Sequence, residues 1–245
     1  MKKYIPNFIT LVNLFCGCCA LASVFYGQFL QAFWFSFASG IADYLDGMLA
    51  RWLETKSPLG KELDSLADMV SFGVVPGAIL YMLLVNGLEG GEVDLPIEKL
   101  IIAASPAFLV SVFAALRLAN FNLDTRQTDN FIGLPTPPCA MFTIGLMLIY
   151  NFDSFGWKNL VCSPFFLYPT IVLLCFLLVA EFPMFSFKFK QLSWKGNEIR
   201  IIFAVVAVSM LFFLQEAAFS LIIAAYVLFA IFNNLFLKNK LRNGE

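Results

Sequence analysis

The sequence predicts an all-α membrane protein, a polytopic bundle of about eight transmembrane helices. Hydrophobic residues make up 60% of the 245 residues, and the mean hydropathy is +0.80. Charged residues account for 13%, compared with about 25% in an average soluble domain. The apolar residues fall into eight segments of about the length that crosses a bilayer, roughly 20 residues. These observations place the whole chain, residues 1–245, in a single integral membrane domain.

Polar connections separate the eight apolar segments. The segments run near 8–26, 29–50, 65–86, 99–119, 137–151, 163–181, 199–214 and 217–237. The fifth and seventh are short, so we expect them to tilt or to extend at their ends.

Lysine and arginine gather in every second connection and at both ends of the chain. Fourteen of the sixteen belong to this set: Lys2, Lys3, Arg51, Lys56, Lys61, Arg117, Arg126, Lys188, Lys190, Lys195, Arg200, Lys238, Lys240 and Arg242. Only Lys99 and Lys158 lie in the other connections, which are mostly acidic. Because basic residues stay on the cytoplasmic side, both termini are expected there, in the cytoplasmic membrane. The net charge of −1, without a basic patch interleaved with aromatics, indicates no nucleic-acid partner.

Four aspartates lie within twenty-six residues of an otherwise apolar chain: Asp43, Asp46, Asp64 and Asp68. At about 100° per residue, the first two share a face of one helix and the last two share a face of the next. Carboxylates this close repel one another unless a divalent cation lies between them. All-oxygen ligands in a chain without histidine favour Mg²⁺ or Mn²⁺ over zinc.

The residues around the aspartates suit a phosphorylated ligand. Gly47 and Ala50 add no bulk to the carboxylate face of the first helix, while Arg51 and Lys61 supply positive charge nearby. Ser71 follows Asp64 and Asp68 on the face of the second helix. Because Arg51 and Lys61 belong to the basic connections described above, the cluster is predicted to lie at the cytoplasmic edge of the membrane.

The pattern Asp43-x2-Asp46-Gly47-x2-Ala50-Arg51-x8-Gly60-x3-Asp64-x3-Asp68 resembles the signature of the CDP-alcohol phosphotransferases at every fixed position. The resemblance implies that family's membrane fold, with a catalytic core at about 4–182 and two further spans at about 199–237. It also implies transfer of a phosphatidyl group from CDP-diacylglycerol to an alcohol, with release of CMP, and it suggests a homodimer.

Further motifs resemble the bacterial and archaeal phosphatidylserine synthases within that family, which implies L-serine as the acceptor. They are the opening Pro6-Asn7-Phe8-Ile9-Thr10, the segment from Asp64 to Gly73, Arg117-Leu118-Ala119, and Gly133-Leu134-Pro135-x-Pro137. The likeness covers residues 4 to about 150. Asn120 departs from it, because a second arginine is expected there. Glycerol 3-phosphate, inositol phosphate or another alcohol stays open as the acceptor.

The resemblance also implies roles for single residues. Asp43, Asp46 and Asp64 would bind two metal ions, with Asp64 bridging them, while Asp68 would complete the site or accept the proton of the serine hydroxyl. Gly47, Ala50 and Gly60 would leave room for the cytidine and its phosphates.

Asn7 and Thr10 would bind the donor or be ordinary polar residues of a helix start. Arg51 would neutralise a phosphate, Ser71 would contact the acceptor or be a simple helix serine, and Arg117 would bind a phosphate or carboxylate or anchor its helix at the membrane surface.

Three further features of the sequence admit more than one interpretation. Lys2 and Lys3 before an apolar run, with Ala20-Leu21-Ala22, are also typical of a cleaved signal peptide; we interpret the segment as a retained first helix, since Pro6, Asn7 and Thr10 fit the family. The six cysteines are interpreted as buried reduced thiols. A transporter using membrane aspartates would be expected to show repeated halves, and this sequence has none.

Overall fold

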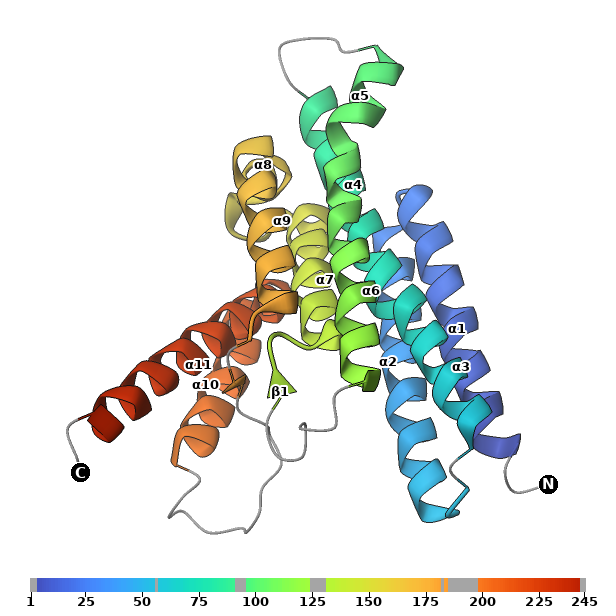
Figure 1. Ribbon diagram of the computed structural model, residues 1–245. Helices are drawn as coiled ribbons and strands as arrows, with labels where there is room; N and C mark the ends of the chain where they lie inside the picture. Colours follow the sequence, from blue (N-terminus) through green and yellow to red (C-terminus); the bar gives the residue numbers. More distant parts are fainter. Residues whose placement is uncertain are drawn as a thin grey trace.

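A computed structural model describes residues 4–55, 57–90, 96–123, 131–181, 183–184 and 198–242. Its elements in chain order are α1 (Tyr4–Phe25), α2 (Phe29–Trp52), α3 (Pro58–Asp68), η1 (Met69–Val74), α4 (Val75–Glu89), α5 (Ile97–Ala104), η2 (Ser105–Phe108), α6 (Leu109–Leu123), β1 (Phe131–Ile132), α7 (Thr136–Phe152), η3 (Ser154–Gly156), α8 (Lys158–Cys162), α9 (Pro164–Val179), β2 (Pro183–Met184), α10 (Glu198–Leu214), η4 (Gln215–Ala217) and α11 (Ala218–Arg242). The helices form a bundle (Figure 1). The predicted helical membrane fold is confirmed, and the only strands within the described residues are the two-residue β1 and β2.

Each of the eight predicted segments corresponds to one helical rod. The third rod runs without a break through α3, η1 and α4, and the fourth through α5, η2 and α6. Among the described residues, four stretches are long and apolar enough to cross a membrane, namely Tyr4–Phe25, Pro58–Glu89, Ile97–Leu123 and Phe203–Phe232, and α7 and α9 are shorter apolar helices. The chain is thus a multi-pass membrane protein, while eight as the number of spans stays a prediction.

The third rod is longer than the sequence predicted. It begins at Pro58 rather than near residue 65 and has 32 residues, which corresponds to about 48 Å of helix. This length exceeds the hydrocarbon core of about 30 Å. Lys61 and Glu62, in the first turns of α3, are both exposed. The beginning of α3 therefore extends past the apolar layer.

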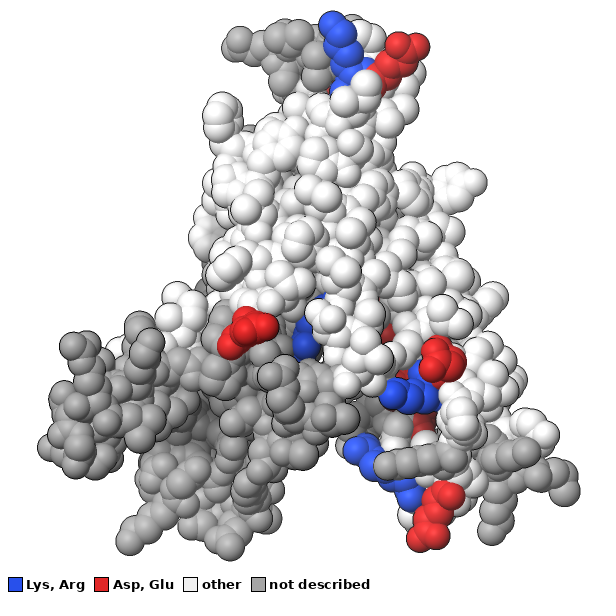
Figure 2. All heavy atoms as spheres, viewed as in Figure 1, with Lys and Arg blue, Asp and Glu red and all other residues white. Residues whose placement is uncertain are grey.

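The two ends of the bundle differ in what they carry. The start of α1, the end of α11 and the turn between α2 and α3 lie at the lower end of Figure 1, and the start of α5 lies at the upper end. Figure 2 shows charged side chains near these two ends and a broad uncharged band between them. Seven of the fourteen basic residues named above lie outside the described residues: Lys2, Lys3, Lys56, Arg126, Lys188, Lys190 and Lys195.

Helices α1 and α2 pack through small and short polar side chains. The buried face of α1 is formed by Pro6, Thr10, Asn13, Gly17, Ala20, Ser23 and Val24, and that of α2 by Phe29, Ala32, Ser36, Ser39, Ala42 and Asp46. Small residues allow two membrane helices to approach closely, and short polar side chains then hydrogen-bond across the interface. This tight pair forms one wall of the site described below.

Helix α4 lies at the centre of the apolar core. Its residues Ile79, Leu80, Leu83 and Leu84 are fully buried. They belong to one cluster that also contains residues of α7 and α9, such as Met147 and Leu178. The bundle is thus held together mainly around α4.

The last two helices fold back on each other at η4. The ring of Phe203 on α10 contacts those of Tyr226 and Phe229 on α11, with centroids 6.0 and 5.9 Å apart. The Oγ atom of Ser220 donates a hydrogen bond of 2.7 Å to the carbonyl of Phe142 on α7. This hairpin is therefore attached to the rest of the bundle through α7.

A tight connection precedes α7. Gly133 has a φ of +74°, and a Cβ built there would lie 2.6 Å from the carbonyl oxygen of Ala180. The backbone N–H of Leu134 donates to the carbonyl of Leu177, at 2.8 Å. The β1–β2 pair joins the same two segments, with Phe131 opposite Met184. Glycine at position 133 thus allows the chain to cross the end of α9 before entering α7.

Candidate active site

The turn between α2 and α3 places the aspartates of the two helices opposite one another. Ser57 caps α3, because its Oγ atom accepts a 3.0 Å hydrogen bond from the backbone N–H of Gly60. Pro58 at the start of α3 has the fixed φ suited to the first helical position. The antiparallel arrangement lets residues on the end of α2 meet residues on α3.

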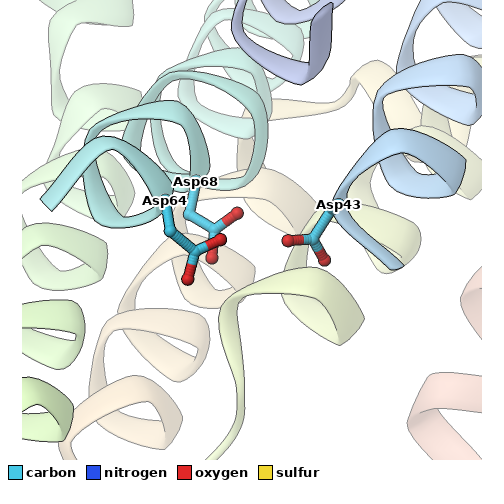
Figure 3. Close-up of side chains that lie close together, drawn as sticks. All are labelled: Asp43, Asp64 and Asp68. Carbon is cyan, nitrogen blue, oxygen red and sulfur yellow. The ribbon is translucent and has the colours of Figure 1, made fainter. Parts of the chain in front are cut away.

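Three carboxylates meet at this point. Asp43 extends from α2, while Asp64 and Asp68 lie one turn apart on α3 and point toward it (Figure 3). One oxygen of each of the three lies within 4.8 Å of the others. All three side chains are partly buried. Three negative charges at this separation strongly oppose one another without a cation.

The oxygen atoms of this triad suit a hard divalent cation. The Oδ1 atom of Asp68 is buried and accepts no hydrogen bond from the described part of the chain. A buried carboxylate oxygen without a donor is costly, and a metal ion would compensate it. Carboxylate ligands and the absence of histidine from the sequence favour Mg²⁺ or Mn²⁺. The residues present therefore fit the kind of ion that the sequence predicted.

Asp46 lies apart from the triad, which differs from the predicted set of four ligands. It is only 4% exposed, and its Oδ2 atom accepts a hydrogen bond of 2.5 Å from Thr10 Oγ1. It still lies close enough to Asp43 and Asp64 to interact electrostatically with both. The helical spacing put Asp43 and Asp46 on one face, but the hydrogen bond from α1 goes to Asp46, while Asp43 meets the carboxylates of α3.

A partly polar cavity of about 440 Å³ opens between the start of α1, the end of α2 and the start of α3. It is lined by Pro6, Asn7, Thr10, Asp46, Gly47, Ala50, Thr55, Ser57, Pro58, Gly60, Lys61 and Asp64. Seven of the predicted site residues, namely Asn7, Thr10, Asp46, Gly47, Ala50, Gly60 and Asp64, are among them. A Cβ built at Gly47 meets no described atom within 4 Å outside its own stretch of helix backbone, so this glycine borders open space.

A second, apolar cavity of about 490 Å³ lies on the other side of α2. Its walls come from α2, η1, α7 and α11, and include Phe33, Phe37, Met141, Ile144 and Phe219. Asp43 is the one carboxylate among its lining residues within the described chain. The triad therefore borders the polar cavity through Asp64 and the apolar cavity through Asp43.

Gly60 lines the polar cavity and also lies against two polar side chains. A Cβ built there would lie 2.9 Å from Asn7 Oδ1 and 3.0 Å from Ser57 Oγ. The space beside this glycine is thus filled by the protein itself. Its small size lets the start of α3 approach α1, whereas Gly47 borders open space.

Three further predicted residues lie outside both cavities. Ser71 is 3% exposed and donates a hydrogen bond of 2.8 Å to Asn13 Oδ1, so its hydroxyl points into the helix interface. The six-residue turn η1 is a π-helix that begins directly after Asp68, and it shifts Ser71 away from the α-helical face assumed for Asp64 and Asp68. Arg51 is exposed in the last turn of α2.

Arg117 is buried in the bundle rather than exposed on its surface. It is 6% exposed, and its guanidinium lies 5.9 Å from the centre of the Phe121 ring. Asn120, the departure noted in the sequence, is exposed on the same helix. Its neighbour Asn122 instead contacts α3, where its Nδ2 atom donates to Ser65 Oγ at 2.7 Å and its carbonyl accepts from Lys61 Nζ at 3.2 Å.

The hydrogen-bond partners of Thr10 and Asn13 were not predicted from the sequence. Asn13 is fully buried and accepts hydrogen bonds from two serines on other elements. One signal was available, because Thr10 and Asn13 are three residues apart and so share a face of α1. The residues that they contact on α2 and η1 could not be read from spacing alone.

Comparison with known proteins identifies the family of this chain. The family model described as CDP-alcohol phosphatidyltransferase matches residues 3–182. The chain therefore belongs to the CDP-alcohol phosphatidyltransferase family. Within the match lie all of the residues that border the triad and the polar cavity; helices α10 and α11 follow it.

Several curated relatives carry the same name, CDP-diacylglycerol–serine O-phosphatidyltransferase. The Helicobacter pylori protein is 33% identical over 96% of this chain and 93% of its own length. The Bacillus subtilis protein is 36% identical over 61% of this chain and 78% of its own length. The Methanocaldococcus jannaschii protein is 34% identical over 60% of this chain and 62% of its own length.

Proposed function

We propose that this protein transfers the phosphatidyl group of CDP-diacylglycerol to L-serine, which yields phosphatidylserine and CMP. One observation carries the proposal: a carboxylate triad joins a partly polar cavity on one side of α2 to an apolar cavity on the other. A nucleotide-activated lipid has both characters, with the reacting pyrophosphate at the boundary between them. The relatives named for this reaction support the choice of serine.

The triad is the proposed holder of Mg²⁺ or Mn²⁺, with two ions as the expected number. Asp43, Asp64 and Asp68 would supply the ligands, and Asp46 would join them through its second carboxylate oxygen. When bound, such ions neutralise phosphate oxygens and hold the reacting groups in line. Cation binding by this cluster is supported by the buried oxygen of Asp68 that has no hydrogen-bond donor in the described chain.

The protein's own side chains would orient the donor. Gly47 and Ala50 leave open the part of the polar cavity where the cytidine and its phosphates would bind. Lys61 lines the same cavity, and an ammonium group there would attract a phosphate oxygen. Because the other cavity is apolar, it would accept an acyl chain at the edge facing lipid.

Serine attack requires that one proton be removed. The serine oxygen would form a bond to the phosphorus that carries diacylglycerol, while the bond from that phosphorus to the bridging oxygen breaks and CMP leaves. The proton of the hydroxyl would move to a carboxylate oxygen of Asp68. Placing this base within the triad keeps it beside the reacting phosphate.

The charge distribution supports a cytoplasmic site. Asp43 lies in the second half of α2, and Asp64 and Asp68 lie in the short helix α3, so the triad lies toward the α2–α3 turn. The start of α1 and the end of α11 lie at the same end of the bundle as that turn (Figure 1). Arg51 and Lys61 flank that turn, and basic residues favour the cytoplasmic side. Both termini would then be cytoplasmic, and the working unit would be a homodimer with a catalytic core at 4–182.

A panel of acceptors tests the proposal. The purified protein is supplied with CDP-diacylglycerol and Mg²⁺ or Mn²⁺, and CMP release is measured with L-serine, glycerol 3-phosphate, inositol phosphate or no acceptor. We expect release that requires serine and ceases when the metal is chelated. Release that depends on glycerol 3-phosphate or inositol phosphate instead would keep the chemistry but overturn the acceptor, and no metal-dependent release with any acceptor would overturn the proposal.

A further inference from the structure

Three polar side chains from three elements meet in the buried interior of the bundle, about one helical turn from the triad. The Oδ1 atom of Asn13 on α1 accepts hydrogen bonds from Ser39 Oγ on α2, at 2.5 Å, and from Ser71 Oγ on η1, at 2.8 Å. Asn13 and Ser39 have no exposed surface, and Ser71 is 3% exposed. We call these three residues the Asn13 clasp.

Each serine of the clasp lies about one helical turn along the chain from a carboxylate of the triad. Ser39 precedes Asp43 by four residues, which is one turn of α2. Ser71 follows Asp68 by three residues on the rod formed by α3 and η1. The clasp therefore ties the two carboxylate-bearing rods to one atom of α1, one turn away from the carboxylates themselves.

The same helix also holds the fourth aspartate. Thr10, three residues before Asn13, donates its hydrogen bond to Asp46. The approach of η1 to α1 depends on Gly17, because a Cβ there would lie 3.2 Å from the Cα of Ser71. Helix α1 thus contacts both rods through a single stripe of small and polar residues.

The two serines of the clasp donate their hydrogen bonds to another helix rather than to the backbone of their own helix. A buried helix serine can donate to the carbonyl four residues earlier, as Ser23 does to Cys19 at 2.8 Å. Ser39 and Ser71 instead donate to another helix, and two such bonds to one oxygen fix the relative height of α2 and η1. Because the three side chains are buried, each bond lies in a medium of low dielectric constant and is hard to replace.

We infer that the Asn13 clasp is a positioning device, which sets the distance between Asp43 and the pair Asp64 and Asp68 and so prepares the triad to bind a divalent cation. This inference rests on the proposed function only in assigning a divalent metal ion to the triad. Residues that orient metal ligands typically contribute about 10- to 100-fold to metal affinity.

The alternative is an ordinary buried polar cluster that only stabilises the bundle. The two roles separate when the cluster is made apolar as a whole. Replacing both partners of a buried hydrogen bond by apolar groups can be nearly neutral for stability. The Nδ2 atom of Asn13 is also buried and donates to no described residue, so its removal relieves a cost. If the cluster only stabilises the bundle, apolar side chains at all three positions would therefore substitute for it. If it positions the carboxylates, they would not.

The test measures Mn²⁺ binding and metal-free stability rather than phosphatidyl transfer. The variants are Asn13→Leu, Ser39→Ala, Ser71→Ala and the triple variant that combines them, with Ser23→Ala as a matched control on the buried face of α1. Free Mn²⁺ is followed by electron paramagnetic resonance in detergent, and thermal unfolding is recorded without metal.

We expect Asn13→Leu to weaken Mn²⁺ binding about tenfold or more, and each serine variant to weaken it less. The triple variant should regain thermal stability relative to Asn13→Leu but keep the weakened binding, while Ser23→Ala should match the unaltered protein. Normal Mn²⁺ affinity in Asn13→Leu, or affinity that returns together with stability in the triple variant, would overturn the inference. If Asn13→Leu does not fold, the two serine variants decide: unchanged affinity in both overturns it.

The outcomes also separate this inference from the proposed function. If the unaltered protein binds Mn²⁺ and releases CMP with serine, but the clasp variants bind Mn²⁺ normally, the inference fails and the function stands. If the protein binds Mn²⁺ through the clasp-dependent site but releases no CMP with any acceptor, the function fails and the positioning role stands.

Discussion

The hydroxyl of Thr10 on α1 donates a hydrogen bond of 2.5 Å to Oδ2 of Asp46 on α2, and both side chains are 4% exposed. This bond separates Asp46 from the three other aspartates, whose oxygens meet within 4.8 Å. Helix α1 therefore takes part in the site even though it contributes no member of the triad.

Replacing Thr10 with valine tests that contact. Valine keeps the shape of the side chain but leaves one oxygen of Asp46 without its donor, and a hydrogen bond to a charged group contributes about 1.5–3 kcal/mol. We expect Thr10→Val to slow serine-dependent CMP release about tenfold and to raise the metal concentration that the reaction requires. Thr10→Ser keeps the donor and serves as the control; equal losses in both variants would show that the hydrogen bond is not the cause.

Gly47 offers a graded test of the polar cavity. A Cβ there meets no atom within 4 Å, so alanine at this position should fit and also favour the helix. Gly47→Leu would fill part of the space assigned to the nucleotide, and we expect it to raise the KM for CDP-diacylglycerol about tenfold, equivalent to about 1.4 kcal/mol. Gly47→Ala should change the KM little, and a leucine variant with an unaltered KM would place the nucleotide elsewhere.

Gly133 and Gly27 form a matched pair for the structural role of glycine. Both have positive φ, +74° and +67°, but a Cβ at Gly27 meets nothing within 4 Å, whereas one at Gly133 meets the carbonyl oxygen of Ala180. The left-handed conformation costs a non-glycine residue about 1–2 kcal/mol, so Gly27→Ala should lower the free energy of unfolding by about that much. Gly133→Ala adds a steric clash, and we expect it to lower the free energy of unfolding more than Gly27→Ala does, which a larger fall in thermal unfolding temperature would show. Equal falls in unfolding temperature for the two variants would contradict the close contact between Gly133 and the end of α9.

Much of the fold could be predicted because its signals are local. Apolar runs placed the eight rods, and the regular spacing of Asp43, Asp46, Asp64 and Asp68 indicated a site between two neighbouring helices. The start of the third rod was misplaced, since Pro58, Lys61 and Glu62 form a helical extension that is too polar to count as a span.

The parts that could not be predicted depend on contacts between helices. Spacing on α2 cannot show that Asp46 faces Thr10 while Asp43 faces α3. The π-helical turn after Asp68 changes the phase of the rod, so Ser71 turns toward Asn13 instead of continuing the face of Asp64. Likewise, the apolar cavity beside Asp43 includes Phe219 from α11, a helix that follows the family match and that carried no assigned role.

The most direct test of the account measures CMP release from CDP-diacylglycerol and serine by Asp64→Asn and Asp68→Asn. Glu62→Gln is the matched control, because Glu62 is an exposed acid on α3 outside the triad. We expect both aspartate variants to insert into membranes normally and to lose at least about 100-fold in rate, since each loses a ligand or base in the site, while the control keeps its rate. Near-normal rates in both aspartate variants would contradict the central claim that these carboxylates carry the reaction.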